Sequence, residues 1–435
     1  MYQGIKTVSF EEAVKVVKSG DRIHIHSVAC APQGLIQALC NRGRAGELRA
    51  VKLQHLHTEG SAPYAEAEFE GIFFLESYFV GSNVRKPTQE GYADYVPVHL
   101  SETQKLIRSG IHPVDVAMIQ VCPPDKHGFV SMGTSVDATL AAVQNAKTVI
   151  AVINPNVPRA WGDAIIRLSD IDIFCEDNTP LIEAHPATLT EQDIAIGKNV
   201  ASLIEDGATL QMGIGAIPNA VLSQLGNHKN LGIHTEMFAD GVLPLYEKGV
   251  VNNMNKKFDK GKIVSTFLMG SKRVYDFIDD NPGVAMMDVG YTNDPFIIAQ
   301  QPKMTAINSA LSVDITGQVN ADSLGIKFYS GSGGQLDFIR GAAASEGGKP
   351  IIALPAVTNK GVSKSCPTLL NGAGVVTTRF DVHYIVTEFG IADLYGKTLQ
   401  ERAKTLINIA HPDHRETLDK AAFERFGSHY HFISK

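Results

Sequence analysis

Two glycine-rich loops are the segments of this sequence whose composition and spacing best suit chemistry. The first, Gly213 to Asn219, reads GIGAIPN and lies between a strand-like and a helix-like segment. Its backbone N–H groups, close to the start of a helix, suit a phosphate or a developing oxyanion. The second contains Gly333 and Gly334, where a substrate can approach the backbone without meeting a Cβ atom. We expect amides of both loops to converge on one ligand.

The carboxylate of Glu236 lies between these two loops, in the stretch LGIHTEMFADG, residues 231–241. An isolated glutamate is usually a solvated surface group, so its presence alone would carry little weight. Its apolar flanks, and its position just after the helix of the first glycine loop, predict that it points into a cleft.

The first loop also permits a dinucleotide-binding interpretation, because Glu236 follows it by the about 20 residues typical of a ribose-binding acid. The third glycine of the GxGxxG pattern is Pro218 here, so the close packing of helix on strand that glycine allows is lost. A nucleotide-dependent oxidoreductase is therefore the alternative from a different class of function.

Other residue patterns that could indicate a metal site or a hydrolase do not have the spacing that such sites require. His24 and His26, and His55 and His57, form two HxH pairs without a Glu or Cys at supporting spacing, so we expect no metal site. His55 and His57 are candidates for lining a substrate pocket. No GxSxG or HExxH motif is present. Trp161, the only tryptophan, fits either a pocket wall or a core anchor.

Composition limits the class of protein. Lys and Arg total 39 and Asp and Glu total 46, and the resulting net charge of −7 argues against a nucleic-acid partner. With 44% apolar and 20% charged residues, the 435-residue chain is typical of a globular protein. Five cysteines without a CxxC pair predict no disulfide framework. No membrane-spanning stretch or signal sequence is recognisable, so we expect a cytoplasmic protein.

The elements that must position these residues show a weak internal repeat. Residues 16–39 and 203–225 share the order helix end, glycine turn, strand, loop and proline-started helix. Two later pairs of strand-like segments match in the same order: 116–121 with 284–289, and 147–155 with 349–355. We therefore predict an α/β fold of two similar domains from an internal duplication, residues 1–190 and 191–435, with mixed or parallel sheets. The active site is expected at the domain interface.

Four stretches taken together, GIGAIPNAVL, LGIHTEMFADG, GSGGQLDFIRGAAAS and VTEFGIADLYGKTLQERAKTLINIAHPDHRE, resemble the acetyl-CoA hydrolase/transferase family. The sequence of these motifs most resembles the 4-hydroxybutyrate and butyrate CoA-transferase branch of that family. The resemblance covers nearly the whole chain, including PQGLIQAL and HLHTEG. It implies two α/β domains, a homodimer, and ping-pong transfer of CoA between carboxylic acids through a thioester on a glutamate. Matched by motif, that glutamate is Glu236.

The same resemblance implies roles for other motif residues. CoA contacts and oxyanion donors would come from Gly213, Ile214, Gly215, Ala216, Ile217, Gly333 and Gly334. Asn293 would hold the Glu236 side chain. Acyl-CoA and short-chain carboxylates are the implied substrates, and no metal or redox cofactor is needed. Acyl-CoA hydrolysis on the same scaffold and a non-catalytic CoA-binding protein stay open as alternatives, as does the choice among acetate, butyrate and 4-hydroxybutyrate.

Overall fold

The computed structural model describes residues 4–185, 188–428 and 430. Their contacts divide the chain into two compact units. The first contains the described residues of Met1–His185 together with Lys262–Asn293, and the second those of Pro186–Gly261 and Asp294–Lys435. A single boundary near residue 190 therefore differs from the structure at Lys262–Asn293. This segment packs with the first unit because its strands β14 (Ile263–Ser265) and β16 (Val284–Met286) continue a small sheet from β8 (Trp161–Gly162).

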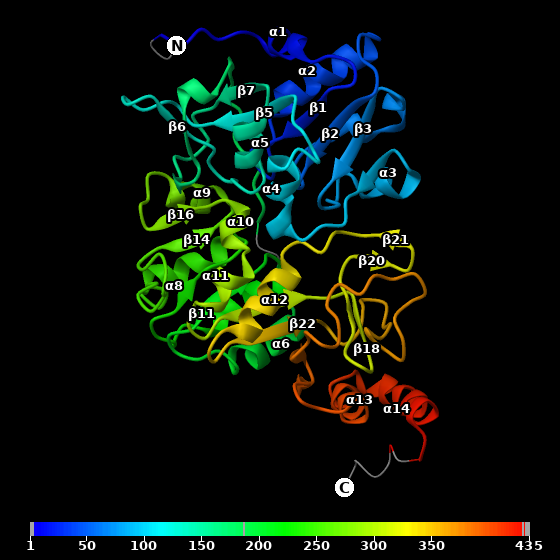
Figure 1. The fold of residues 1–435 in the computed structure, drawn as a ribbon. Helices are drawn as coiled ribbons and strands as arrows, with labels where there is room; N and C mark the ends of the chain where they lie inside the picture. Colours follow the sequence, from blue (N-terminus) through cyan, green and yellow to red (C-terminus); the bar gives the residue numbers. More distant parts are fainter. Residues whose placement is uncertain (1–3, 186–187, 429, 431–435) are drawn as a thin grey trace. The chain divides into compact units, whose positions relative to one another are not determined.

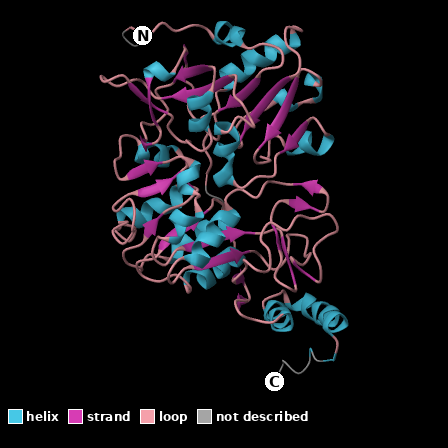
Figure 2. Ribbon diagram, viewed as in Figure 1, coloured by secondary structure: helices cyan, strands magenta, loops and turns pink. Residues whose placement is uncertain are grey.

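The first unit is built on a seven-stranded sheet in which every pairing is parallel (Figures 1 and 2). The strand order is β10 (Ile173–Glu176), β7 (Thr148–Ile153), β5 (Val116–Val121), β1 (Arg22–Ile25), β2 (Val51–His55), β3 (Phe73–Ser77) and β4 (Ala93–Tyr95). All six residues of β5 are buried, as expected for a central strand of a parallel sheet that is covered on both faces. The main helices are α2 (Gln33–Arg44), α4 (Leu100–Arg108) and α5 (Thr139–Asn145).

The second unit contains a six-stranded sheet. Its strand order is β12 (Gly232–Ile233), β11 (Thr209–Met212), β17 (Thr305–Ser309), β22 (Lys349–Ala353), β24 (Tyr384–Thr387) and β25 (Gly390–Asp393). The first five strands are parallel, and β25 is antiparallel to β24. Its longer helices are α6 (Glu191–Ala201), α7 (Ala216–Gln224), α12 (Gln335–Ala344), α13 (Leu399–Asn408) and α14 (Pro412–Phe426). The two units together give the predicted two-domain α/β fold with parallel and mixed sheets.

The two sheets repeat one strand order, β2-β1-β5-β7-β10 in the first unit and β12-β11-β17-β22-β24 in the second. This confirms the predicted matches of residues 16–39 with 203–225 and of 147–155 with 349–355. The match of 116–121 with 284–289 is wrong, because β17 stands where β5 stands and β16 belongs to the small sheet of the first unit. Both segments read as short buried apolar runs, and local sequence does not tell one such strand from another.

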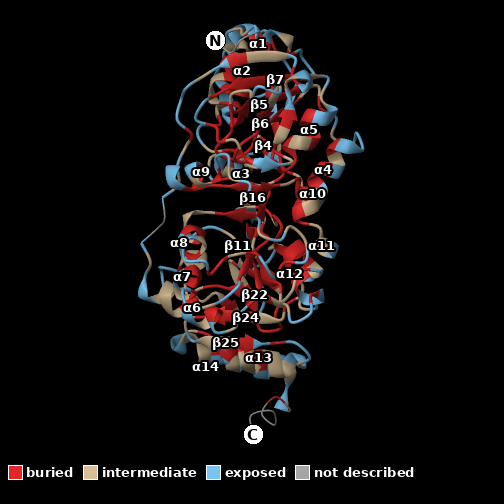
Figure 3. Cartoon of the chain, turned by 90° about the vertical axis from the view of Figure 1, so that its left-hand side faces the viewer, coloured by how far each residue is buried: buried red, intermediate tan, exposed pale blue. Residues whose placement is uncertain are grey.

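Helices in the second unit cover its sheet on both faces. Figure 3 shows α6 and α7 on one side of the buried strands β11 and β22, and α12 with α11 (Pro295–Ala299) on the other. Thr190 caps α6 through a reciprocal capping box with Asp193, which fixes where that helix begins. No helix in the described part of the chain is long and apolar enough to cross a membrane.

We predict that Gly197→Ala destabilises the protein, because Gly197 of α6 sits directly on the backbone of α7. A Cβ at this position would lie 2.7 Å from the carbonyl carbon of Ala220 and 2.8 Å from its oxygen. Overpacking costs up to about 3 kcal/mol, and helix propensity returns about 1, so we expect a net loss of about 2 kcal/mol.

Urea unfolding measures this change, with Gly226→Ala as the matched control, since a Cβ on the exposed Gly226 meets no atom within 4 Å. An unchanged urea midpoint for Gly197→Ala would show that α6 and α7 separate without cost.

Candidate active site

The carboxyl ends of β12, β11 and β17 meet at one edge of the second sheet. Leu210 of β11 pairs with Ile233 of β12, and Met212 pairs with Ile307 of β17. Since the three strands are parallel, the chain leaves all of them at the same edge, where ligands of α/β sheets bind. The loop Gly213–Gly215 leaves β11 there. Glu236 follows three residues after Ile233, the last residue of β12.

The second glycine loop is attached to this edge through Gln335, the first residue of α12. The Gln335 side-chain amide donates to the carbonyl of Ser309, the last residue of β17, at 2.7 Å. Its Oε1 accepts a hydrogen bond from the Thr377 hydroxyl at 3.0 Å. Gly333 and Gly334, which come directly before Gln335, therefore lie at the carboxyl end of β17, the strand that neighbours β11.

Both loops end as the N-caps of helices. Gly215 precedes α7 with φ +117° and ψ −174°, a conformation open to glycine and rare for other residues. Gly334 precedes α12, and Gly333 has a φ of +53°. The first N–H groups of a helix have no acceptor within it, so Ala216 and Ile217 carry donors at the start of α7. The edge thus presents two helix N-termini, each with the partial positive charge that attracts an anion.

The backbone beside Glu236 is held by a buried hydroxyl. Thr235 is fully buried, and its Oγ1 accepts a hydrogen bond from the Met212 N–H at 3.2 Å. The same hydroxyl donates to the Met237 carbonyl at 2.8 Å. Glu236 itself is half-buried between two buried neighbours. Its peptide is therefore fixed to the end of β11, while the residue stays partly exposed.

Asn293 belongs to the first unit, where it is fully buried at the C-terminus of α10 (Val289–Thr292). Its N–H donates to the carbonyl of Val289 at 3.0 Å. The helix is held against α4 by an ion pair between Arg108 and Asp288 at 2.6 Å. The predicted role of Asn293 in holding the Glu236 side chain stays a prediction.

The two HxH pairs lie on or just after β1 and β2, in the first unit. Three of the histidines are hydrogen-bonded: His24 Nε2 with Thr139 Oγ1 at 3.1 Å, His26 Nε2 with the Ser135 carbonyl at 2.8 Å, and His55 Nε2 with the Tyr64 hydroxyl at 2.9 Å. The ring of His57 packs against Phe79 and Phe267. Burial lowers the pKa of His24 and His55 to about 3 and of His26 and His57 to about 4, so all four are neutral at pH 7. Among the described residues, no three His, Cys, Asp or Glu side chains gather to hold a metal ion.

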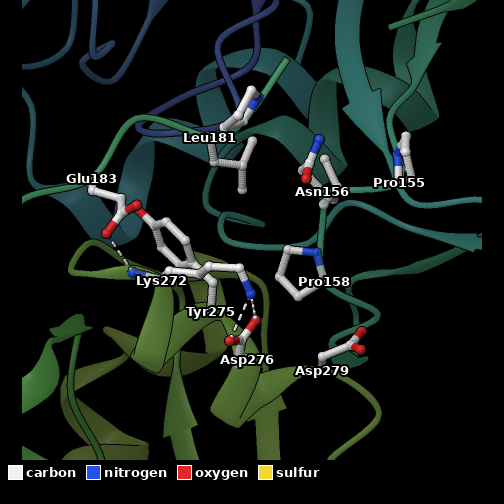
Figure 4. A pocket seen from close by; sticks show the side chains of 11 residues that line it. Pro155, Asn156, Pro158, Leu181, Glu183, Lys272, Tyr275, Asp276 and Asp279 are labelled. Atoms are coloured by element: carbon white, nitrogen blue, oxygen red, sulfur yellow. Dashed lines mark hydrogen bonds and ion pairs between the residues drawn. The ribbon is translucent and has the colours of Figure 1, made fainter. Parts of the chain in front are cut away.

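A pocket of about 130 Å³ lies in the first unit but contains none of the predicted site residues (Figure 4). The Lys272 ammonium in its wall pairs with Asp276 at 2.5 Å, and the Lys272 N–H donates to Glu183 at 2.7 Å. The charges of Lys272 and Asp276 therefore compensate each other, so the pocket offers less to a substrate than the edge that carries Glu236. Trp161 on β8 is 42% exposed, which excludes the core-anchor interpretation.

Sequence reasoning missed that the HTE motif occurs twice, each time after the corresponding strand of one of the two sheets. His57-Thr58-Glu59 follows β2, and His234-Thr235-Glu236 follows β12, the strand with the same place in the repeated order. Glu59 is half-buried, and burial raises its pKa. The signal was present in the sequence, in HLHTEG and GIHTEMF, and aligning the two repeats beyond their first helices would have found it.

Comparison with known proteins matches both parts of the chain to one family. Residues 2–183 match the N-terminal domain of the acetyl-CoA hydrolase/transferases, and residues 270–422 match the C-terminal domain. A succinyl-CoA:acetate/propanoyl-CoA:succinate CoA transferase of Fasciola hepatica is 52% identical, over 95% of this chain and 87% of the relative. A 4-hydroxybutyrate coenzyme A transferase of Clostridium kluyveri is 47% identical, over 97% and 98%.

An acetyl-CoA hydrolase of Yarrowia lipolytica is more distant, with 28% identity over 79% of this chain and 74% of the hydrolase. Among solved structures, RipA from Yersinia pestis superposes with a TM-score of 0.91 at 35% identity, with 97% of each chain covered.

We predict that Thr235→Val lowers the free energy of unfolding by about 1–3 kcal/mol, because it leaves the Met212 N–H without its acceptor. Valine keeps the shape of threonine, so packing changes little. Urea unfolding measures the difference, and the exposed Thr368 provides a Thr→Val control that should be neutral. Equal losses in the two variants would show that the hydroxyl contributes nothing at this edge.

Proposed function

Because the chain belongs to the acetyl-CoA hydrolase/transferase family, we propose that it is a CoA-transferase acting between an acyl-CoA and a short-chain carboxylate. The observation that supports the proposal most strongly is the placement of Glu236 beside two glycine loops at one sheet edge. The relatives that are 47% and 52% identical to this chain are named as CoA transferases, which favours transfer of CoA over hydrolysis of acyl-CoA.

In the first half-reaction, the Glu236 carboxylate attacks the thioester carbonyl of the acyl-CoA. The C–S bond breaks, CoA leaves as a thiolate, and a mixed anhydride joins the acyl group to Glu236. The thiolate then attacks the glutamyl carbonyl, which releases the acyl group as a free acid and leaves CoA in thioester linkage to Glu236. The oxygen that bridged the anhydride departs with the acid.

In the second half-reaction, an incoming carboxylate attacks the glutamyl thioester, and the same steps run in reverse to give a new acyl-CoA and free Glu236. The first acid leaves before the second enters, so the kinetics are ping-pong. Each addition forms a tetrahedral oxyanion, and fixed N–H donors therefore matter more than a general base. Gly213–Ile217 and the pair Gly333 and Gly334 supply these donors and the contacts to CoA in this proposal.

The acid partners are short-chain carboxylates such as acetate, butyrate or 4-hydroxybutyrate, and CoA enters as substrate. No step of the scheme calls for a metal or a redox cofactor. We further propose a cytoplasmic homodimer with the site at the interface of the two domains, in which Asn293 holds the Glu236 side chain. This assembly follows from the family resemblance.

Hydrolysis is the alternative on the same scaffold, with water in place of the acceptor acid. It is distinguished by the release of free CoA thiol from acyl-CoA in the absence of any acceptor carboxylate. A non-catalytic CoA-binding protein would lose nothing when Glu236 is changed. A nucleotide-dependent oxidoreductase would instead bind a nicotinamide nucleotide, which an absorbance titration detects.

We predict that incubation with acyl-CoA attaches CoA covalently to Glu236, and that borohydride then reduces the thioester and inactivates the enzyme. Mass spectrometry with peptide mapping locates the adduct. Glu236→Gln should form no adduct and lose turnover, whereas Glu247→Gln, at an exposed glutamate of the same unit, should behave as the wild type. An adduct at another residue, or full activity of Glu236→Gln, would refute the assignment.

We predict that Gly334→Ala lowers kcat at least about tenfold while the KM for acyl-CoA changes little. The reason is that the Gly333-Gly334 amides face an oxygen that becomes fully negative only in the tetrahedral species. Initial-rate measurements separate the two parameters. A much higher KM at unchanged kcat would instead make this loop a CoA-holding element.

A further inference from the structure

The strand that leads to Glu236 is the shortest strand of the six-stranded sheet and lies at the edge of that sheet. β12 contains only Gly232 and Ile233, and its one neighbour in the sheet is β11. On this inner side the Gly232 N–H donates to the Ala208 carbonyl at 2.9 Å, and the His234 N–H donates to the Leu210 carbonyl at 3.1 Å. An edge strand of two residues forms few backbone hydrogen bonds with its sheet, so these bonds alone fix its position weakly.

The outer side of β12 is held by the segment that follows, residues 250–256. The Leu231 N–H donates to the Val250 carbonyl at 2.9 Å. The Ile233 N–H donates to Asn253 Oδ1 at 2.8 Å, and the Ile233 carbonyl accepts from Lys256 Nζ at 2.9 Å. Two side chains therefore take the place that a further strand would occupy, and both act on Ile233.

Burying the Lys256 ammonium at this position costs desolvation free energy. Lys256 is 0% exposed, and its stem lies against Gly232, where a Cβ would come within 2.8 Å of Lys256 Cγ. Burial lowers the pKa of Lys256 to about 7, an effect that the charge of Asp259 opposes. A methionine has nearly the same length and would pack without this desolvation cost. What it lacks is the charge-assisted hydrogen bond to the Ile233 carbonyl.

We propose that Lys256 is a positioning residue for the reaction, which together with Asn253 fixes Ile233 and so aims the Glu236 carboxylate three residues later. The inference rests on the proposed function, in which Glu236 is the nucleophile. Thr235 holds the chain to β11 on the inner side, and Lys256 holds it on the outer side. The two attachments, at Ile233 and Thr235, come three residues and one residue before Glu236, so they limit the movement of its peptide.

A nucleophile displaced by about 1 Å can lose on the order of 100-fold in rate, because the reacting atoms must meet in a near-attack geometry. Lys256 is fully buried and its ammonium serves a backbone carbonyl, so its removal should leave substrate binding unchanged. We therefore expect Lys256→Met to lower kcat by about 10- to 100-fold with little change in KM.

The test compares Lys256→Met with Lys257→Met, its exposed neighbour, whose ammonium contacts Gln300 at 3.2 Å. Steady-state rates give kcat and KM, and rapid quenching with mass spectrometry gives the rate at which CoA attaches to Glu236. Thermal unfolding checks that each variant is folded. We expect slow attachment at Glu236 in Lys256→Met alone. A folded Lys256→Met with wild-type kcat, or with raised KM at unchanged kcat, would overturn the proposal.

Should Lys256→Met fail to fold, Asn253→Ala carries the test, since it removes the other attachment of Ile233 and leaves the lysine in place. A folded Asn253→Ala variant should show the same loss of kcat at constant KM, and wild-type turnover would overturn the proposal. Failure of the proposed function looks different, because CoA would then attach elsewhere, or nowhere, in the wild type. Attachment at Glu236 at an unchanged rate in the variants would refute only the positioning role.

Discussion

Parallel pairing of β12, β11 and β17 determines which residues leave the second sheet side by side. Leu210 opposite Ile233 and Met212 opposite Ile307 set Glu236, the Gly213 loop and the Gly333-Gly334 loop at one edge. A slip of one residue in β12 would turn its side chains to the other face of the sheet. The Thr235 hydroxyl on one side and the Lys256 ammonium on the other hold that register where the strand is too short to hold itself.

The same strand order occurs in both units, but the catalytic glutamate is proposed only in the second unit. In the first unit the residues after β1 are 26–31, HSVACA, instead of a glycine loop, and Val28 adopts a φ of +55°. Its N–H donates to the His57 carbonyl, and its own carbonyl accepts from the Glu59 N–H. The loop after β1 is therefore hydrogen-bonded to the HTE segment after β2. The two sheets thus share a strand order and differ in the loops that follow their strands, and the proposed site depends on the loops of the second unit.

Local sequence pattern correctly predicted the strand, loop and helix around Gly20 and Gly207 and the two-domain α/β fold. The roles of the candidate residues around Glu236 stay predictions. The sequence did not predict that Lys262–Asn293 rejoins the first unit, because a buried strand such as β16 carries no signal of the sheet it enters. The burial of Lys256 could not be predicted from the sequence either. Its neighbours NNMNKKFDK read as a polar surface loop, and only the fold shows that one of these lysines is buried at a strand edge.

The most direct measurement of the central claim follows one oxygen atom. If Glu236 carries CoA between acids, the bridging oxygen of the second anhydride comes from the acceptor carboxylate and stays on Glu236 when the new acyl-CoA departs. One turnover with an ¹⁸O-labelled acceptor acid in ordinary water should therefore leave one ¹⁸O atom in the peptide that contains Glu236. An unlabelled Glu236 after the labelled acceptor has been converted to acyl-CoA would contradict the account.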